Sequence, residues 1–264
     1  MGTCPTAQRT PSPSSPARGR RSPYPRAVVL LDGLYDDRYP EFYAESCARD
    51  DPFVVCADGA LRSVADLMPD ITPQLVVGDM DSLGDVDRDG WEQRGTRFDD
   101  TWDGQTAKDY TDGQLALYAA LNEGPQGIDI HGALPRRDAY DHDHFLGNLS
   151  LISEARERLG DAPDDAVRIA EPLETIALCR HRLTLRRVGV GLNRVSLVAC
   201  GGSSRVARSE GLRWDLAGLE VCAAPANALR NEFTVDATTV TIEMARGSAP
   251  VYVFHNRYDQ DAHA

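Results

Sequence analysis

The sequence predicts a mainly parallel α/β domain with helices on both faces of its sheet, a Rossmann-like three-layer arrangement, followed by an all-β domain. Three observations predict these domains. Four short runs in the first part of the chain are almost wholly apolar, which is typical of parallel strands covered on both faces. The stretches between them carry apolar residues at helical spacing. After residue 165 the pattern changes to short strand-like segments separated by Gly, Pro and Asn.

The first domain is predicted to span residues 26–160. Its expected strands are 27–31, 53–57, 74–77 and 128–131. Its expected helices are 59–67, 111–121 and 144–159, the last with Leu146 and Leu149 in its buried stripe. Each strand ends at Gly or Asp, so small and acidic residues follow one edge of the sheet. Ligands of open α/β sheets bind at that carboxyl edge, where we expect the functional site.

The second domain is predicted to span residues 161–264, and a turn-rich linker at 160–165 joins the two domains. Its expected strands are 167–169, 175–178, 183–186, 194–199, 219–223, 232–235, 238–244 and 251–254. So many short strands predict a sandwich or a barrel. Residues 1–25 are rich in Pro, Ser and Arg and contain no apolar run, which predicts a disordered leader.

The composition is typical of a folded protein, with 42% hydrophobic and 26% charged residues among 264. A formal net charge of -13 argues against nucleic acid and anionic lipid as partners, because both bind clustered Lys and Arg. No apolar run reaches the roughly 18 residues of a membrane span. The six cysteines form no Cys-x-x-Cys pair, which predicts neither a zinc site nor a disulfide framework and favours a cytoplasmic location.

The segment Gly78–Ser82 reads Gly-Asp-Met-Asp-Ser and follows a β-branched run. Its glycine lets the chain leave the strand sharply, and its spacing can turn Asp79 and Asp81 towards one pocket. Mg²⁺ prefers oxygen ligands and is usually held by one or two carboxylates together with substrate phosphate. The motif therefore predicts a magnesium site. The alternative is a solvated turn in which Ser82 caps the following helix.

A second acidic cluster, Lys108–Asp112, lies at the start of a predicted helix. The helix dipole favours acidic residues there, so one interpretation makes Thr111 or Asp109 the cap and Asp112 part of the first turn. In the other interpretation, Lys108 meets a phosphate group while Asp109 or Asp112 joins the metal shell.

The segment His131–His144 follows a predicted strand and leads into a helix that contains Asn148. Gly132 permits a close backbone approach, Arg136 and Arg137 offer forks for phosphate, and the helix start offers amide donors to an anion. The local Asp-His-Asp-His pattern lacks a closed ligand set, so hydrogen bonding or capping is favoured over metal ligation by His.

Six short segments can be compared with known motifs. In chain order they are Cys56–Ala60, Gly78–Ser82, Lys108–Asp112, Asp143–Asn148, Gly211–Leu216 and Asn231–Phe233. Together they resemble the ordered motifs of the thiamine pyrophosphokinase family. These are its Ala-Asp-Gly-Gly-Ala turn, its Gly-Asp-x-Asp-Ser and Lys-Asp-x-Thr-Asp elements, its Asp-His-x-Leu-x-Asn helix start, its Gly-Leu-Lys-Trp-x-Leu stretch and the end of its Ser-Asn-Glu-Phe stretch. Six ordered matches across nearly the whole folded chain rarely arise by chance.

The resemblance implies an ATP-binding α/β domain, a thiamine-binding β-sandwich and a homodimer whose thiamine sites lie between the subunits. It implies Mg²⁺-dependent transfer of a pyrophosphoryl group from ATP to the thiamine hydroxyl, with release of AMP. The matched residues then have these roles: catalysis by Asp79, Asp81, Asp109 and Asp112; Mg²⁺ binding by Asp79, Asp81 and Asp112; nucleotide or phosphate contact by Asp58, Gly59, Ser82, Lys108, Arg137, His144 and Asn148; and thiamine contact by Trp214 and Asn231.

The chain departs from the family pattern at three places. Ala60 replaces the second glycine of the first turn, a small change. Arg136–Arg137 lies further from Asp143–His144 than in the family's Gly-Gly-Arg-x-Asp-His, which leaves open which arginine contacts phosphate. Arg230 replaces the serine before Asn231, where a bulky cation can alter the thiamine pocket.

Two other functions stay open. A diphosphokinase for another small heterocyclic alcohol, such as a pterin, would share the acidic ATP half. The Trp214 and Asn231 matches argue against it, although the alternative for Trp214 is an ordinary core aromatic. A non-catalytic thiamine or nucleotide sensor would keep the fold but lose metal ligands, and the retained Asp79, Asp81 and Asp112 argue against it.

Overall fold

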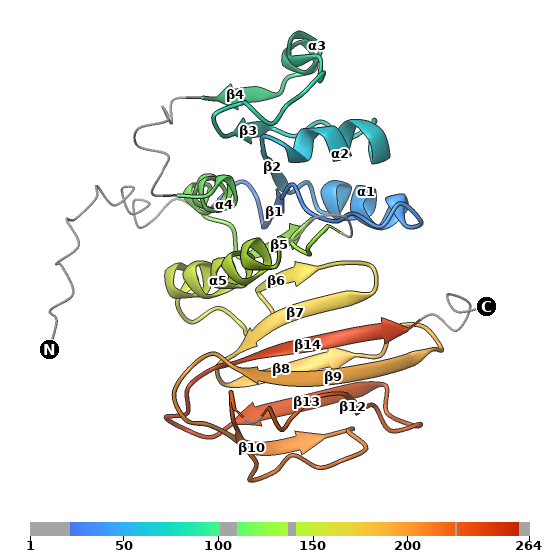
Figure 1. The fold of residues 1–264 in the computed structure, drawn as a ribbon, viewed down its shortest axis with the longest axis vertical. Helices are drawn as coiled ribbons and strands as arrows, with labels where there is room; N and C mark the ends of the chain where they lie inside the picture. The colour runs from blue at the N-terminus through green and yellow to red at the C-terminus, as the bar shows by residue number, and fades with distance from the viewer. Residues whose placement is uncertain (1–21, 101–109, 137–140, 225, 259–264) are drawn as a thin grey trace, which may run out of the picture.

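The computed structural model describes residues 22–100, 110–136, 141–224 and 226–258, so that Lys108, Asp109 and Arg137 lie outside the described residues. It contains a large mixed sheet with helices along its first part (Figure 1). Within the described residues this sheet has ten strands, in the spatial order β12 (Asn231–Glu232), β9 (Leu192–Ala199), β14 (Val251–Tyr258), β7 (Glu174–Cys179), β6 (Val167–Ala170), β5 (Gly127–His131), β1 (Arg26–Leu30), β2 (Phe53–Ala57), β3 (Leu75–Val77) and β4 (Arg97–Asp99).

The strands from β6 to β4 are parallel, which confirms a mainly parallel sheet in the first half of the chain. The chain runs outward from β1 through β2 and β3 to β4, and then returns to place β5 on the other side of β1. The strand order therefore reverses at β1. In open α/β sheets such a switch point leaves a crevice at the carboxyl ends of the strands, and this is where ligands bind.

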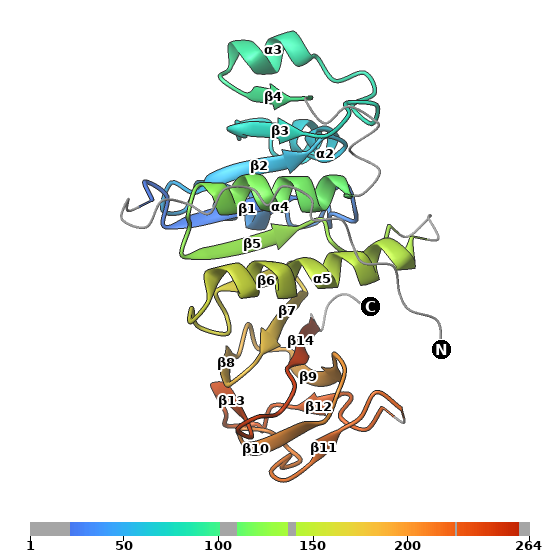
Figure 2. The same cartoon turned by 90° about the vertical axis from the view of Figure 1, so that its left-hand side faces the viewer.

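Helices cover both faces of the parallel strands (Figures 1 and 2). One face carries α1 (Pro40–Ala48) and α2 (Ala60–Leu67), and the other carries α4 (Asp112–Asn122) and α5 (His142–Leu159). Because successive strand residues point to opposite faces, Val28 of β1 packs in the cluster with α1 and α2 while Val29 packs in the cluster with α4 and α5. The three predicted helices are confirmed to within two residues, and α1 and α3 (Arg88–Gln93) are additional.

Two details of the predicted first domain differ from the structure. The expected buried stripe of α5 is wrong at Leu146, which is 67% exposed, although Leu149 is buried as predicted. At the other end of the domain, the chain already packs from Ser22 onward. The Tyr24 ring lies 5.4 Å from that of Phe53, and the Ser22 hydroxyl donates to the carbonyl of Glu123.

The predicted linker at 160–165 is a short, anchored turn. Asp164 is buried, and its Oδ2 accepts hydrogen bonds from the backbone amides of Arg180, His181 and Arg182 at 2.7–2.9 Å. The strand that follows, β6, pairs in parallel with β5 and antiparallel with β7. The large sheet therefore continues across the predicted boundary between the two domains.

The second half of the chain forms a further sheet of β11 (Glu220–Val221), β10 (Ser204–Glu210), β13 (Thr239–Met244) and β8 (Arg182–Arg186). A separate hydrophobic cluster joins it to the antiparallel part of the large sheet, with members such as Ile242 on β13 and Val253 on β14. The predicted strands at 219–223 and 232–235 are reduced to two residues each, and β10 is additional.

The cysteines and the helices concern the expectations about disulfides and membrane spans. All five described cysteines are free. None of the described helices combines the length and the apolar character that a membrane span requires.

Candidate active site

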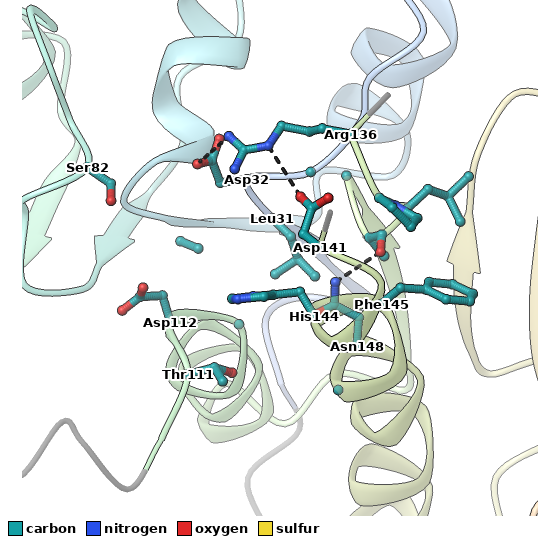
Figure 3. Close-up of a pocket in the computed structure, with 18 of the residues that line it drawn as sticks. Leu31, Asp32, Ser82, Thr111, Asp112, Arg136, Asp141, His144, Phe145 and Asn148 are labelled. Carbon is teal, nitrogen blue, oxygen red and sulfur yellow. Dashed lines mark hydrogen bonds and ion pairs between the residues drawn. The ribbon is translucent and has the colours of Figure 1, made fainter. Parts of the chain in front are cut away.

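A cavity of about 680 Å³ opens at the carboxyl edge of the parallel strands, where the strand order reverses around β1 (Figure 3). The segments that follow β1, β2, β3 and β5 form its walls, together with the first turns of α4 and α5. Six of the predicted site residues line this cavity: Asp58, Asp79, Ser82, Asp112, His144 and Asn148. The structure thus brings residues from four separate sequence motifs to one place.

Three carboxylates form a compact group beside this cavity. Asp58, Asp79 and Asp81 each offer an oxygen, and these oxygens all lie within 4.8 Å of one another. Asp58 is buried while Asp79 and Asp81 are exposed. Asp58 Oδ1 accepts a hydrogen bond from the Gly59 amide at 2.6 Å, whereas its buried Oδ2 has no hydrogen-bond partner. A buried carboxylate oxygen without a donor is costly, and a bound cation would satisfy it.

The turn after β3 places two of these carboxylates. Gly78 has a φ of +146°, and a Cβ there would lie 2.8 Å from the Asp58 side chain, so only glycine fits. Met80 also has a positive φ, of +66°. Asp79 Oδ1 accepts from the Asp81 amide at 3.1 Å, and Asp81 Oδ1 accepts from the Ser82 hydroxyl at 2.9 Å. Ser82 therefore orients Asp81, and no helix begins at this serine.

The electrostatics of the carboxylates also fit a cation. Burial, together with the charges of Asp58, Asp79 and Asp81, raises the pKa of Asp112 to about 6. Burial, together with the charges of Asp79 and Asp81, raises the pKa of Asp58, and it outweighs the backbone amides of Gly59 and Ser82, which lower this pKa. In the described part of the chain no arginine or lysine forms an ion pair with any of the four. An all-oxygen donor set of this kind suits Mg²⁺.

The start of α4 confirms the capping interpretation of the second acidic cluster. The Thr111 hydroxyl accepts from the Gln114 amide, and the Gln114 side chain accepts from the Thr111 amide, which completes a capping box. Asp112, in the first turn, lines the cavity as well. It lies outside the compact group of three.

Among the described residues, Arg136 is the arginine that lines the cavity, whereas Arg137, the other candidate for phosphate contact, lies outside them. The Arg136 guanidinium lies 3.5 Å from Asp32 and 3.4 Å from Asp141 (Figure 3). Asp32 also pairs with Arg62 at 3.0 Å. Asp32 was not among the predicted site residues, yet the pattern of strands ending in Asp and Gly marks it, since it directly follows the first strand.

The first turns of α5 contribute two predicted residues. The His144 side chain extends from α5 towards the side of the cavity where Asp112 lies (Figure 3). Asn148 donates through Nδ2 to the carbonyl of Ala133 at 2.9 Å. Asn148 therefore holds the segment after β5, which forms part of the cavity wall.

The predicted thiamine residues contact each other in the second half of the chain and do not line this cavity. Asn231 Oδ1 accepts from the Trp214 amide at 3.2 Å, and Asn231 Nδ2 donates to the Trp214 carbonyl at 2.7 Å. The Trp214 side chain is 52% exposed, so the interpretation of an ordinary core aromatic is wrong. The Arg213 guanidinium lies over the indole, 4.8 Å from the ring centroid.

Comparison with known proteins finds a family model and solved structures that are similar to the chain. Residues 44–159 match the family model described as thiamin pyrophosphokinase, catalytic domain. Solved structures similar to the chain include thiamine pyrophosphokinase from Bacillus subtilis, with a TM-score of 0.68 and 18% identity over 89% of this chain and 99% of that one. The yeast enzyme gives 0.69 and 15% over 90% and 88%, and the Candida albicans protein 0.61 and 16% over 94% and 97%. No curated protein sequence matches the chain.

The fold and the cavity define an α/β protein with a carboxylate-lined cavity at the switch point of its parallel strands. The matched residues 44–159 run from α1 to the end of α5 and contain all four carboxylates. Residues 44–159 match the catalytic domain of the thiamin pyrophosphokinase family, whose members are enzymes.

Proposed function

We propose that the protein catalyses Mg²⁺-dependent transfer of a pyrophosphoryl group from ATP to the hydroxyl of thiamine, giving thiamine diphosphate and AMP. One observation carries this proposal. The buried Asp58 Oδ2 has no partner and lies in a group with Asp79 and Asp81 that no described cation neutralises. The match to the catalytic domain of the family supports the choice of thiamine as the acceptor.

In this proposal Asp58, Asp79 and Asp81 would hold Mg²⁺ together with Asp112 from the first turn of α4. When bound, Mg²⁺ neutralises the charge of the polyphosphate and of the oxygens between which the group moves. The turn of Gly78 and the hydrogen bond from Ser82 fix the carboxylates before ligand arrives. Such preorganisation matters because phosphoryl-type transfer depends mostly on positioning and charge stabilisation.

Arg136 is our candidate for the cation that contacts phosphate. It is shared between Asp32 and Asp141 at distances of 3.4–3.5 Å, which are long for charge-assisted hydrogen bonds. A phosphate oxygen can therefore compete for its guanidinium at modest cost. The roles of Lys108, Asp109 and Arg137 stay predictions, and they rest on the family resemblance.

We interpret the two packed sheets of the second half as a β-sandwich that binds thiamine. Trp214 is exposed for ring stacking, and Asn231 fixes its backbone through two hydrogen bonds. Arg213 covers one face of the indole and is paired with Glu232 at 2.9 Å, so the substrate ring would take the other face. Arg230 has a φ of +56° and is exposed, which keeps its side chain out of the protein core.

Trp214 does not line the acidic cavity of its own chain, which leads us to propose a homodimer with shared sites. Mixing inactive Asp81→Asn with inactive Trp214→Ala tests this. After subunit exchange, half of the dimers are mixed and each contains one intact shared site, so about a quarter of wild-type activity should return. No recovery despite demonstrated exchange would place both half-sites in one chain.

An assay of AMP release with ATP, Mg²⁺ and thiamine tests the function itself. We expect AMP and thiamine diphosphate in equal amounts, and chelation of Mg²⁺ should stop both. AMP release only with another alcohol, such as a hydroxymethyl pterin, would favour the related diphosphokinase. Tight thiamine binding without AMP release would favour a sensor. A cytoplasmic location stays our prediction, supported by the free thiols of the described cysteines.

A further inference from the structure

One wall of the cavity is a sharp backbone turn after β5, formed by Gly132 and Ala133. Gly132 has a φ of +66°, and a Cβ there would lie 2.2 Å from the carbonyl oxygen of Leu31 and 2.6 Å from the Tyr35 ring. The turn is therefore pressed against the segment after β1, which also lines the cavity. On the carbonyl side, Asn148 holds the turn through the oxygen of Ala133.

The amides of the same turn donate to the carboxyl group of Glu171, a residue that no motif predicts. Glu171 Oε1 accepts from the Gly132 amide at 2.7 Å and lies 3.4 Å from the Ala133 amide. Its other oxygen accepts from the Tyr43 hydroxyl of α1 at 2.9 Å. Glu171 is only 3% exposed, so these hydrogen bonds are shielded from water.

The segment that carries Glu171 is itself firmly anchored. It lies between β6 and β7, where the large sheet changes from parallel to antiparallel. The Glu171 amide donates to the carbonyl of Glu174 at 2.7 Å. Arg257 at the end of β14 donates to the Glu171 carbonyl and to the Thr175 hydroxyl. A rigid support of this kind can fix the position of a loop that it contacts.

We propose that Glu171 is a positioning residue for the nucleotide cavity: its buried carboxyl group clamps the Gly132–Ala133 turn and so sets the shape of the wall against which ATP binds. This inference rests on the proposed function, because it assumes that ATP is the ligand. Glu171 acts through the turn and touches no substrate. The clamp also connects the cavity to β14 of the second half, through Arg257.

Two measurements test the clamp. Calorimetry gives the Kd for ATP in the presence of Mg²⁺ and without thiamine, and the full reaction gives KM and kcat. Glu171→Ala should raise both the Kd and the KM for ATP about tenfold, with little change in kcat, because it misplaces a binding wall. Burial raises the pKa of Glu171 to about 8, so the neutral Glu171→Gln is the conservative variant. It keeps an oxygen for the Gly132 amide and should restore near wild-type affinity.

Glu174→Ala is the matched control. Glu174 lies on the same turn and its side chain meets Asn256, away from the cavity, so ATP affinity should not change. Amide hydrogen exchange should rise at residues 132–134 in Glu171→Ala and stay unchanged there in Glu174→Ala. Equal effects of the two alanine variants would show general destabilisation and overturn the clamp.

Other outcomes separate this inference from the proposed function. A wild-type protein that binds no ATP overturns the proposed function and the clamp together. Wild-type binding that Glu171→Ala leaves unchanged overturns the clamp alone. Should Glu171→Ala not fold, Tyr43→Phe decides, since it removes the hydroxyl that donates to Oε2 and leaves the hydrogen bond of Oε1 in place; the same hydroxyl also accepts from the Asp36 amide. This variant should raise the Kd for ATP about threefold, and unchanged affinity would overturn the clamp.

Discussion

Asp129 and the cavity carboxylates belong to the same parallel sheet but have opposite electrostatic surroundings. Asp129, in the middle of β5, is 7% exposed and pairs with Arg26 at 2.8 Å and Arg168 at 2.6 Å. Burial by itself would raise the pKa of Asp129, but Arg168 and Arg26 outweigh it and lower that pKa. At the carboxyl edge, burial and repulsion raise the pKa values of Asp58 and Asp112, with no compensating arginine among the described residues.

This contrast separates a carboxylate that stabilises the fold from carboxylates that await a ligand. A buried charge with its partners in place contributes to stability, whereas clustered like charges reduce it until a cation binds. Perturbed groups of the second kind concentrate at functional sites. The comparison therefore predicts that substitutions at the two places affect different properties.

The largest expected effect is on turnover at the cavity. Asp81→Asn removes a charged oxygen from the proposed metal site, so AMP release should fall about 1000-fold. The thermal transition of the metal-free protein should stay unchanged or rise slightly, because the substitution also removes repulsion. A stopped assay for AMP and differential scanning calorimetry in EDTA measure the two quantities. Collapse of the fold would instead make Asp81 a structural residue and end the contrast.

The next effect is on stability at Asp129. Asp129→Asn leaves Arg26 and Arg168 without their shared carboxylate, and we expect a loss of about 2 kcal/mol in the free energy of unfolding. Solvent screening limits the loss, because the two arginines are 32% and 39% exposed. Urea unfolding measures it, and turnover per folded molecule should stay near wild type. A selective loss of turnover in a stable variant would show that Asp129 also serves the site.

Lys108 is a candidate cation for the cavity carboxylates, because it is the only lysine in the sequence and lies outside the described residues. The family resemblance places it beside the polyphosphate. Acetylation with an amine-reactive reagent removes its charge, and we expect the Kd for ATP to rise about tenfold while thiamine affinity stays unchanged. Bound ATP and Mg²⁺ should protect the amine from the reagent.

Lys108→Arg supplies the control for this labelling. It keeps the cation and removes the reactive side-chain amine, so the reagent should not change the ATP affinity of this variant. An equal loss of affinity in Lys108→Arg after treatment would place the effect at the N-terminal amine. Lower stability of acetylated metal-free protein would show that Lys108 neutralises the carboxylates, and the contrast with Asp129 would then weaken.

The parts of the protein that the sequence predicts are those with local signals. All-apolar runs mark the parallel strands, and Gly78 and Ser82 frame a motif whose geometry the structure shows directly. By contrast, β10 is mostly polar and depends on pairing with β13, which no local pattern reveals. Asp58 approaches Asp79 because β2 lies next to β3, and this spatial order is a property of the whole sheet.

Glu171 shows the same limit at the level of a single residue. It sits in an ordinary turn, and its partner Gly132 lies 39 residues away in the sequence. Charge and burial also conflict locally, since an isolated Glu before a proline predicts an exposed side chain. Only the assembled fold brings the amides that follow β5 and the Tyr43 hydroxyl of α1 to this carboxyl group, and their hydrogen bonds offset the cost of burying it.

The smallest expected effect concerns the pH dependence of stability without metal. The pKa of Asp112 is about 6 in the folded protein, above its usual value of 3.8, so between these values the folded state holds a proton that the unfolded chain has lost. Stability should therefore fall as pH rises through that window, and the loss should be complete above about pH 6. Asp112→Asn removes this contribution. At pH 7.5 in EDTA it should be more stable than wild type by about 1 kcal/mol, after discounting for solvent screening.

Urea unfolding in EDTA at pH 4.5 and 7.5 measures this difference. Mg²⁺ added in excess of the chelator should stabilise the wild type at pH 7.5 more than it stabilises Asp112→Asn. Asp129 provides a control of opposite sign. Its lowered pKa means that its contribution is present above the unfolded value and is lost as pH falls, so Asp129→Asn should weaken the protein at both pH values. If Asp112→Asn gave no gain at pH 7.5, repulsion at the cavity would be too small to distinguish its carboxylates from an ordinary acidic surface.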